Sequence, residues 1–238
     1  DPIIPSESEN VVKKGETETL KVYITKKSNY YITRIWAYDP YNQLNKYDSP
    51  EYGKNLYRPK VLLEKAIKKY NLSDKLVVGF NASGFYLRDT YDASSVSKYS
   101  KYDKTSVGTL VITNGKVIRN WYNRAYKTWF ITGIDKDNNL RIFKDESGTS
   151  TSAKTKKKTW AEEVINSGIR NTFTFASPLV KNGVKSNITT NMPSPNESLN
   201  RQAICQVDRN NFVLITGKEL DRSDLINIML KEKCQTGM

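Results

Sequence analysis

The sequence predicts an α+β protein: a single domain built on a mixed, largely antiparallel sheet with a few packed helices. Three observations predict this class. Short segments with alternating apolar residues recur along the chain, and polar turns separate several of them. Only three segments predict helices, two through apolar residues gathered on one face and one through a capping box with a glycine at its end. No repeat or linker divides the chain, so we expect one domain over residues 17–238.

The N-terminal part predicts a leader, two strands and a helix. Residues 1–16 begin with the Pro-, Ser- and Glu-containing stretch DPIIPSESEN, which predicts a flexible leader. Residues 17–38 alternate in polarity on both sides of the turn KKSN, which predicts two paired strands. Apolar residues spaced three to five apart over 58–75 predict a helix with Pro59 in its first turn.

The central part predicts a strand at 76–81 and two hairpins. The strand runs into Asn81 and a corner of small residues, which is unusual because Gly and Asn weaken a strand interior. The first hairpin places Asn114-Gly115 in a tight turn between two apolar segments. The second hairpin uses KDNN as its turn.

The C-terminal part adds two helices and two hairpins. A capping box from Thr159 to Glu162, with Gly168 at the end, predicts one helix, and the preceding KTKKK run at 154–158 predicts a solvated loop. An Asn-Gly turn at 182–183 and the turn DRNN predict hairpins. A last helix is expected to be capped by Ser223.

Composition limits the chemistry. The net charge is +13 with 38 Lys and Arg, which favours anionic partners: nucleic acid, wall polymers, phosphorylated sugars or a membrane surface. Histidine is absent, which excludes a Ser-His-Asp triad, a Cys-His pair and imidazole metal ligands. Cys205 and Cys234 allow either one disulfide or two buried thiols. No apolar run has the length of a membrane span.

Four segments in order (GFNASGFY, SPLVKNG, RQAICQVDRNNFVLIT and the last helix into CQTGM) give a resemblance to a known family. Together they resemble the phosphodiester glycosidases, which include the lysosomal enzyme that uncovers mannose phosphate and exported bacterial relatives. The resemblance covers about residues 20 to 238. Two departures are Gln202 and Cys205, where the family pattern has Thr and Gly. The family's Asn-Leu-Asp-Gly-Gly-Gly-Ser signature is expected directly after CQTGM and is absent, which predicts either a chain cut short there, the interpretation we favour, or a member that has lost the signature.

The resemblance implies roles for individual residues. Arg201 would clamp phosphate oxygens through its bidentate guanidinium. Asn81 would hydrogen-bond the sugar or the phosphate, while Ser83 and Gly84 leave room for the substrate. The base or nucleophile would be a carboxylate, either the absent aspartate or, as a substitute, Asp89.

The expected function is therefore hydrolysis of a sugar–phosphodiester bond in an exported or cell-envelope glycan. The alternative is a non-catalytic module that binds an anionic wall polymer or a glycan phosphate. A nucleic-acid partner is not expected, because no motif of a known nucleic-acid reader occurs. No cofactor is expected; calcium or magnesium held by loop carboxylates stays an open alternative, without the support of a spacing such as an EF-hand loop. The start at Asp1 favours an exported, extracytoplasmic protein whose signal has been removed, although a trimmed cytoplasmic protein would begin the same way.

Overall fold

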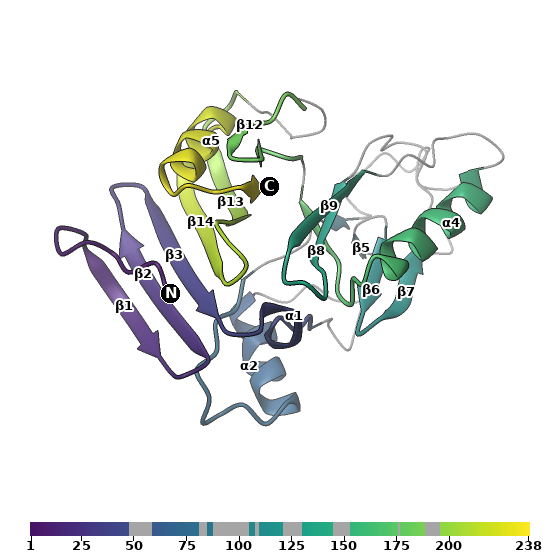
Figure 1. Cartoon of the computed structure of the whole chain (residues 1–238), viewed down its shortest axis with the longest axis horizontal. Helices are drawn as coiled ribbons and strands as arrows, with labels where there is room; N and C mark the ends of the chain where they lie inside the picture. The colour runs from purple at the N-terminus through teal and green to yellow at the C-terminus, as the bar shows by residue number, and fades with distance from the viewer. Residues whose placement is uncertain are drawn as a thin grey trace.

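A computed structural model of the chain describes residues 1–47, 59–80, 85–87, 105–107, 110–120, 130–144, 153–175, 177–188 and 196–238. Its largest element is an eight-stranded sheet in the order β1-β2-β3-β14-β13-β15-β11-β12, and each neighbouring pair is antiparallel (Figure 1). The strands are β1 (Val11–Glu16), β2 (Leu20–Lys26), β3 (Tyr30–Ala37), β11 (Val180–Lys181), β12 (Val184–Lys185), β13 (Leu199–Gln206), β14 (Asn211–Leu220) and β15 (Thr236–Gly237).

Helix α5 (Arg222–Lys231) covers one face of this sheet (Figure 1). Its apolar side chains, including Leu225 and Met229, join a buried cluster with Val213 and Ile215 of β14. A disulfide between Cys205 of β13 and Cys234 fastens the end of the helix to the sheet, with the two Cα atoms 5.8 Å apart. Burial of this apolar face supplies the main driving force for the larger part of the fold.

A second group of elements lies beside the large sheet (Figure 1). It contains a three-stranded sheet in the order β10-β8-β9 and a separate hairpin of β6 and β7, next to helix α4. Its bounds are β6 (Leu110–Thr113), β7 (Lys116–Asn120), β8 (Phe130–Ile134), β9 (Leu140–Lys144), α4 (Ala153–Asn166) and β10 (Phe173–Phe175). Trp160 and Val164 of α4 pack with Ile112 and Ile131 in the core of this group.

Buried polar contacts connect the two groups. The side chain of Gln206, at the end of β13, accepts a hydrogen bond from Leu140 N at 2.7 Å and donates to Asn138 O at 2.5 Å. Nearby, the short helix α1 (Pro40–Gln43) meets Arg170, whose guanidinium lies 5.3 Å from the ring centre of Tyr41. These contacts join segments of the two groups, and those of Gln206 satisfy backbone groups of the β8–β9 hairpin.

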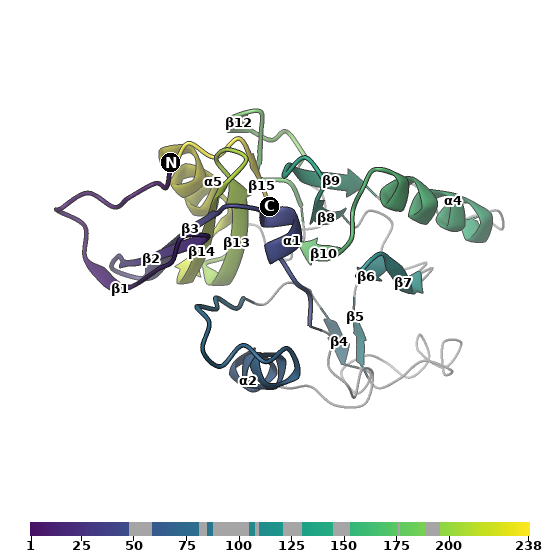
Figure 2. The same ribbon diagram turned by 60° about the horizontal axis from the view of Figure 1, so that its bottom comes forward.

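Helix α2 (Pro59–Lys69) lies on the other side of the large sheet from α5 (Figure 2). The segment after it reaches the sheet: a Cβ atom added to Gly15 of β1 would lie 2.6 Å from Cδ1 of Leu76. A two-stranded pair of β4 (Phe85–Leu87) and β5 (Thr105–Val107) completes the elements. Among the described residues, no helix is long and apolar enough to span a membrane.

The α+β class and the antiparallel sheet are confirmed, and so are the local turn predictions. Asn114-Gly115 and Asn182-Gly183 both have positive φ angles at their two turn residues, as two-residue hairpin turns of this type require. The turn KDNN joins β8 to β9, and DRNN lies between β13 and β14. Helix α2 begins at Pro59 as predicted but ends at Lys69, earlier than the predicted 75.

Two strand-level predictions are corrected. Residues 11–16, expected in the flexible leader, form β1 because they pair with β2 along its whole length. No strand is present at 76–80, the described part of the segment predicted as a strand at 76–81. Instead of entering a ladder, the segment lies against other elements: Leu76 lies close to Gly15 of β1, and Leu63 of α2 lies close to Gly79.

Two helix starts are also corrected. Helix α4 begins at Ala153, so Thr159 lies inside it and residues 154–158 are helical rather than a loop. Its predicted end near Gly168 is confirmed, because Gly168 has a φ of +90°. Helix α5 is capped by Asp221 rather than Ser223: Asp221 accepts from Asp224 N at 2.8 Å, and Asp224 accepts from Asp221 N at 2.9 Å.

Candidate functional site

A hollow of about 560 Å³ lies on the large sheet where β2, β3, β14 and β13 reach one end. Ten residues line it, and none of them is acidic: Lys26, Ser28, Asn29, Tyr31, Asn200, Arg201, Gln202, Thr216, Gly217 and Lys218. We call this feature the basic hollow. Its lining combines cations with neutral amide and hydroxyl groups, which is the donor set that anionic, hydroxyl-rich ligands need.

The strand register arranges the floor of the basic hollow as a row. Lys26 of β2 lies opposite Tyr31 of β3, Tyr31 lies opposite Thr216 of β14, and Thr216 lies opposite Gln202 of β13. Adjacent strands are about 4.8 Å apart, so the row spans four strands on one face. Lys218 is two residues beyond Thr216 on the same strand and thus belongs to the same face.

The alternation of the strands explains why this row is polar. The neighbours of these residues point to the opposite face, where Ile32, Ile215 and Ala203 pack in the core under α5. Farther along the hollow's own face the row changes to Leu214 and Ile204, which are 4 and 5% exposed. Polar side chains are therefore confined to the end of the sheet, where the face is open.

Gly217 shapes the edge of the basic hollow. A Cβ atom at this position would lie 2.5 Å from Cβ of Tyr30 and 2.7 Å from Cδ1 of Leu220, so only glycine allows β3 and β14 to approach so closely here. The adjoining turn is fixed in two places: Lys218 N donates to Asn29 O at 2.9 Å, and Asn29 Nδ2 donates to Lys218 O at 2.9 Å. The rim is thus held by the fold.

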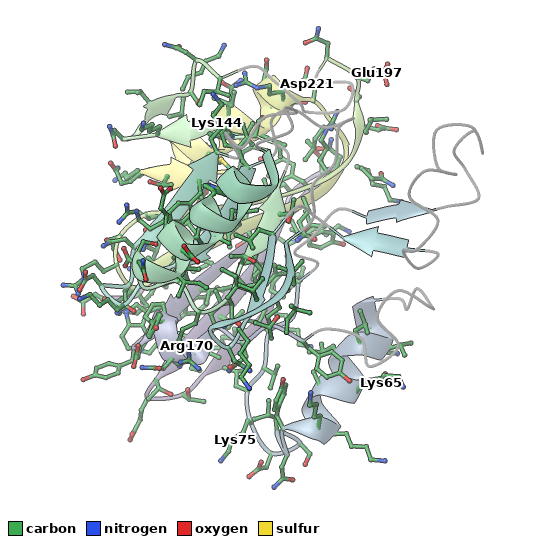
Figure 3. All side chains as sticks on the ribbon, turned by 90° about the vertical axis from the view of Figure 1, so that its right-hand side faces the viewer. Lys65, Lys75, Lys144, Arg170, Glu197 and Asp221 are labelled. Carbon is green, nitrogen blue, oxygen red and sulfur yellow. A yellow bond between two sulfur atoms is a disulfide. The ribbon has the colours of Figure 1, made fainter. Side chains whose placement is uncertain are left out.

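Arg201 borders the basic hollow, but its guanidinium has other partners. Its Nε donates to Leu220 O and its Nη2 donates to Glu197 O, both at 3.0 Å. These two nitrogens form the edge that would grip phosphate oxygens bidentately, so that edge is already bonded. Desolvation lowers the pKa of Arg201, while the negative charges of Asp221 and Glu197 partly offset this by raising that pKa. The two carboxylates lie at the same end of the molecule in Figure 3.

The other residues predicted for the site lie outside the described part of the chain: Asn81, Ser83, Gly84 and Asp89. Phe80, which directly precedes Asn81, has its ring centre 6.1 Å from that of Phe173. The predicted grouping of Asn81 and Asp89 with Arg201 therefore remains a prediction.

Of the ten residues that line the basic hollow, only Arg201 had been predicted as a site residue, so its cations Lys26 and Lys218 and its aromatic residue Tyr31 were among those missed. Each stands at or near the end of a strand, and only the pairing of strands far apart in sequence brings them together. The sequence feature that indicates such a site is a polar residue at the end of a strand whose preceding alternate residues are apolar. In β14, for example, Thr216 follows Phe212 and Leu214 at every second position. That signal alone is equally typical of any solvated strand end.

Behind the basic hollow, on the α5 face, lies a partly buried ion network. Arg34 of β3 bonds Glu232 through Nε at 2.8 Å and Nη2 at 2.9 Å, and its Nη2 also reaches Glu9 at 3.1 Å. Lys27 pairs with Glu9 at 2.9 Å. Desolvation raises the pKa of Glu9, but the hydrogen bonds from Lys27 and Arg34 outweigh it and lower that pKa to about 2. These charges pair with one another and belong to the scaffold.

The carboxylate-rich turn between β8 and β9 has a structural role. Asp135 is buried and its Oδ1 accepts from the backbone N atoms of Asp137 and Asn139, at 3.0 and 2.9 Å. Its Oδ2 lies 3.4 Å from Nη1 of Arg141. In the part of the chain that the structure describes, no group of three or more acidic or cysteine side chains is placed to hold a metal ion.

Three of the four segments that carry the family resemblance lie side by side. RQAIC lies within β13, SPLVKNG contains β11, and CQTGM contains β15, which pairs with both of the other strands. Met238 continues this pairing through two backbone hydrogen bonds with Ile204, each 2.9 Å long. Segments up to 60 residues apart in sequence thus build one region of the sheet.

Comparison with known proteins adds little. No family model matches the chain, and no curated protein matches it. One solved structure that is similar is the crystal structure of a hypothetical protein from Synechocystis, with a TM-score of 0.45 and 8% identity. The match covers 98% of this chain and 58% of that protein, so this chain spans less than two thirds of its length.

Proposed function

We propose that this chain acts on an anionic glycan outside the cytoplasm, as a hydrolase of a sugar–phosphodiester bond. The observation that carries the proposal is the basic hollow, where Lys26, Lys218 and neutral hydrogen-bonding groups surround an exposed Tyr31 without any acidic neighbour in the lining. Cationic and amide donors suit phosphate and sugar hydroxyls, and an aromatic ring suits the face of a sugar. The strands β13, β15 and β11, which carry three of the segments that resemble the phosphodiester glycosidases, are neighbours in the sheet, and this supports the same function.

The chemistry of the proposed reaction sets two demands. The leaving phosphate must be stabilised as an anion, and positive charge that grows at the anomeric carbon must be balanced by a carboxylate. The lysines of the basic hollow suit the first demand. Asp89, with Asn81 as a hydrogen-bonding partner of the substrate, is our candidate for the second.

A second function is a binding module without catalysis, and one observation favours it. None of the ten residues that line the basic hollow carries a carboxylate, and one edge of the Arg201 guanidinium donates hydrogen bonds to backbone carbonyl oxygens. A site of this composition can hold an anion without cleaving it.

The test is an assay of the chain with the methyl diester of N-acetylglucosamine 1-phosphate, in which free sugar is measured by chromatography and binding by calorimetry. Sugar release that Asp89→Asn and Asn81→Ala each reduce at least tenfold supports the hydrolase. Binding without release, equal to that of both variants, supports the binding module. The absence of both binding and release refutes the two functions together.

A further inference from the structure

We infer that the basic hollow recognises an internal unit of a polyanionic glycan, a sugar with an anionic group on each side, rather than a terminal sugar phosphate. This inference rests on the proposed function for the chemical class of the ligand. It adds a specificity that the proposed function leaves open, and three features of the basic hollow carry it.

The first feature is the position of the two cations. Lys26 is on β2, Tyr31 is on β3 and Lys218 is on β14, and these strands are consecutive in the sheet. Lys26 lies directly opposite Tyr31, whereas Lys218 lies diagonally from it on the other side, two residues beyond Thr216. A ligand with a single terminal anion would meet only one of them, whereas a unit within a chain of sugar phosphates would meet both.

The second feature is that these cations are available. In the part of the chain that the structure describes, neither Lys26 nor Lys218 forms an ion pair, and both are exposed. Lys27, the next residue along, points to the other face and pairs with Glu9 at 2.9 Å. Adjacent lysines on one strand end therefore divide their roles, one in the scaffold and one in the basic hollow.

The third feature is the balance of the lining, which favours a glycan over a nucleic acid. A single aromatic ring, Tyr31, 42% exposed, is present in the lining, whereas single-stranded nucleic-acid sites generally stack successive bases on several rings. Neutral groups outnumber the cations and suit sugar hydroxyls: Ser28, Asn29, Asn200, Gln202 and Thr216.

The experiment compares ligands by calorimetry with the intact chain at two salt concentrations. The probes are a synthetic tetramer of N-acetylglucosamine 1-phosphate, the single methyl diester, inorganic polyphosphate of equal charge and a single-stranded oligonucleotide of equal charge. We expect the tetramer to bind at least tenfold more tightly than each of the other three. Its affinity is expected to fall as salt rises, because exposed charges are screened.

The variants locate the effect. Lys26→Ala and Lys218→Ala are each expected to weaken tetramer binding about fivefold, which corresponds to about 1 kcal/mol, and to leave the single diester nearer its original affinity. Tyr31→Ala should weaken the tetramer more than polyphosphate. Lys116→Ala, an exposed lysine on the β6–β7 hairpin, removes the same charge elsewhere and should change affinity less than twofold.

The outcomes separate this inference from the proposed function. Equal affinity for the tetramer and the single diester refutes the internal-unit specificity, while cleavage or binding of the single diester still supports the proposed function. Equal affinity for polyphosphate shows binding by charge alone, and equal or tighter binding of the oligonucleotide replaces the glycan with a nucleic acid. Both of these results overturn the inference.

Discussion

Reduction of the Cys205–Cys234 disulfide should lower the free energy of unfolding by an amount that follows from the length of the loop it closes. The two cysteines are 29 residues apart in sequence. In the chain-entropy model, a loop of this size restricts the unfolded chain by about 3.6 kcal/mol at 25 °C. Both side chains are buried, at 0 and 1% exposed, so the reductant should reach the bond only after unfolding.

The assay is urea unfolding at pH 7, followed by tryptophan fluorescence, of the oxidised protein and of protein unfolded in reductant and refolded in its presence. We expect the free energy of unfolding to differ by about 3–4 kcal/mol. The double variant Cys205→Ala with Cys234→Ala should lose at least as much, because it also leaves small cavities. Alkylation of the unreduced, unfolded protein serves as the control and should label no thiol. A difference below about 1 kcal/mol would refute the view that this bond restrains the unfolded chain.

Three further results are expected from the same unfolding assay. Arg34→Met should cost about 3–5 kcal/mol, because it leaves the buried carboxylate of Glu232 without its partner, and the double variant with Glu232→Leu should recover part of this loss. The pKa of Glu9 is lowered from 4.5 to about 2 in the folded state. The contribution of the Glu9 carboxylate to the free energy of unfolding should therefore be complete above pH 4.5 and decline as the pH falls toward 2. The variant Glu9→Gln should flatten this part of the profile of stability against pH. Gly217→Ala should cost about 1–3 kcal/mol, because its Cβ atom would lie 2.5 Å from that of Tyr30; a cost near zero would mean that β3 and β14 separate readily there.

The turns and hairpins could be predicted because the residues that specify them are local. Asn-Gly at 114–115 and 182–183 adopts the positive φ angles that its type of turn needs, whatever lies around it. Helix starts were less predictable because several residues compete for each cap. At α5, both Asp221 and Ser223 suit the position, and only the reciprocal bonds between Asp221 and Asp224 decide between them.

The order of the strands and the basic hollow could not be predicted, because they depend on contacts between distant segments. Nothing local in CQTGM indicates that Thr236 and Gly237 would lie between β13 and β11. The segment 76–80 has a strand-like composition, yet in the structure it joins no sheet, and it lies instead between Leu63 of α2 and Gly15 of β1. For the same reason, Tyr31 could be assigned to an alternating strand from the sequence, but its two flanking lysines could not.

Strand β13 carries residues of the basic hollow, of the disulfide and of the contact with the second group, and its alternation places the first two on opposite faces. Gln202 faces the basic hollow, Cys205 faces α5, and Gln206 at its end bonds the backbone of the second group at Leu140. Because Gln202 and Cys205 point to opposite faces, loss of the disulfide should not remove any ligand contact. Reduced protein that is still folded should therefore bind the tetramer with unchanged affinity. If the reduced protein binds more weakly under conditions in which fluorescence shows that it is folded, α5 and the basic hollow are coupled through β13.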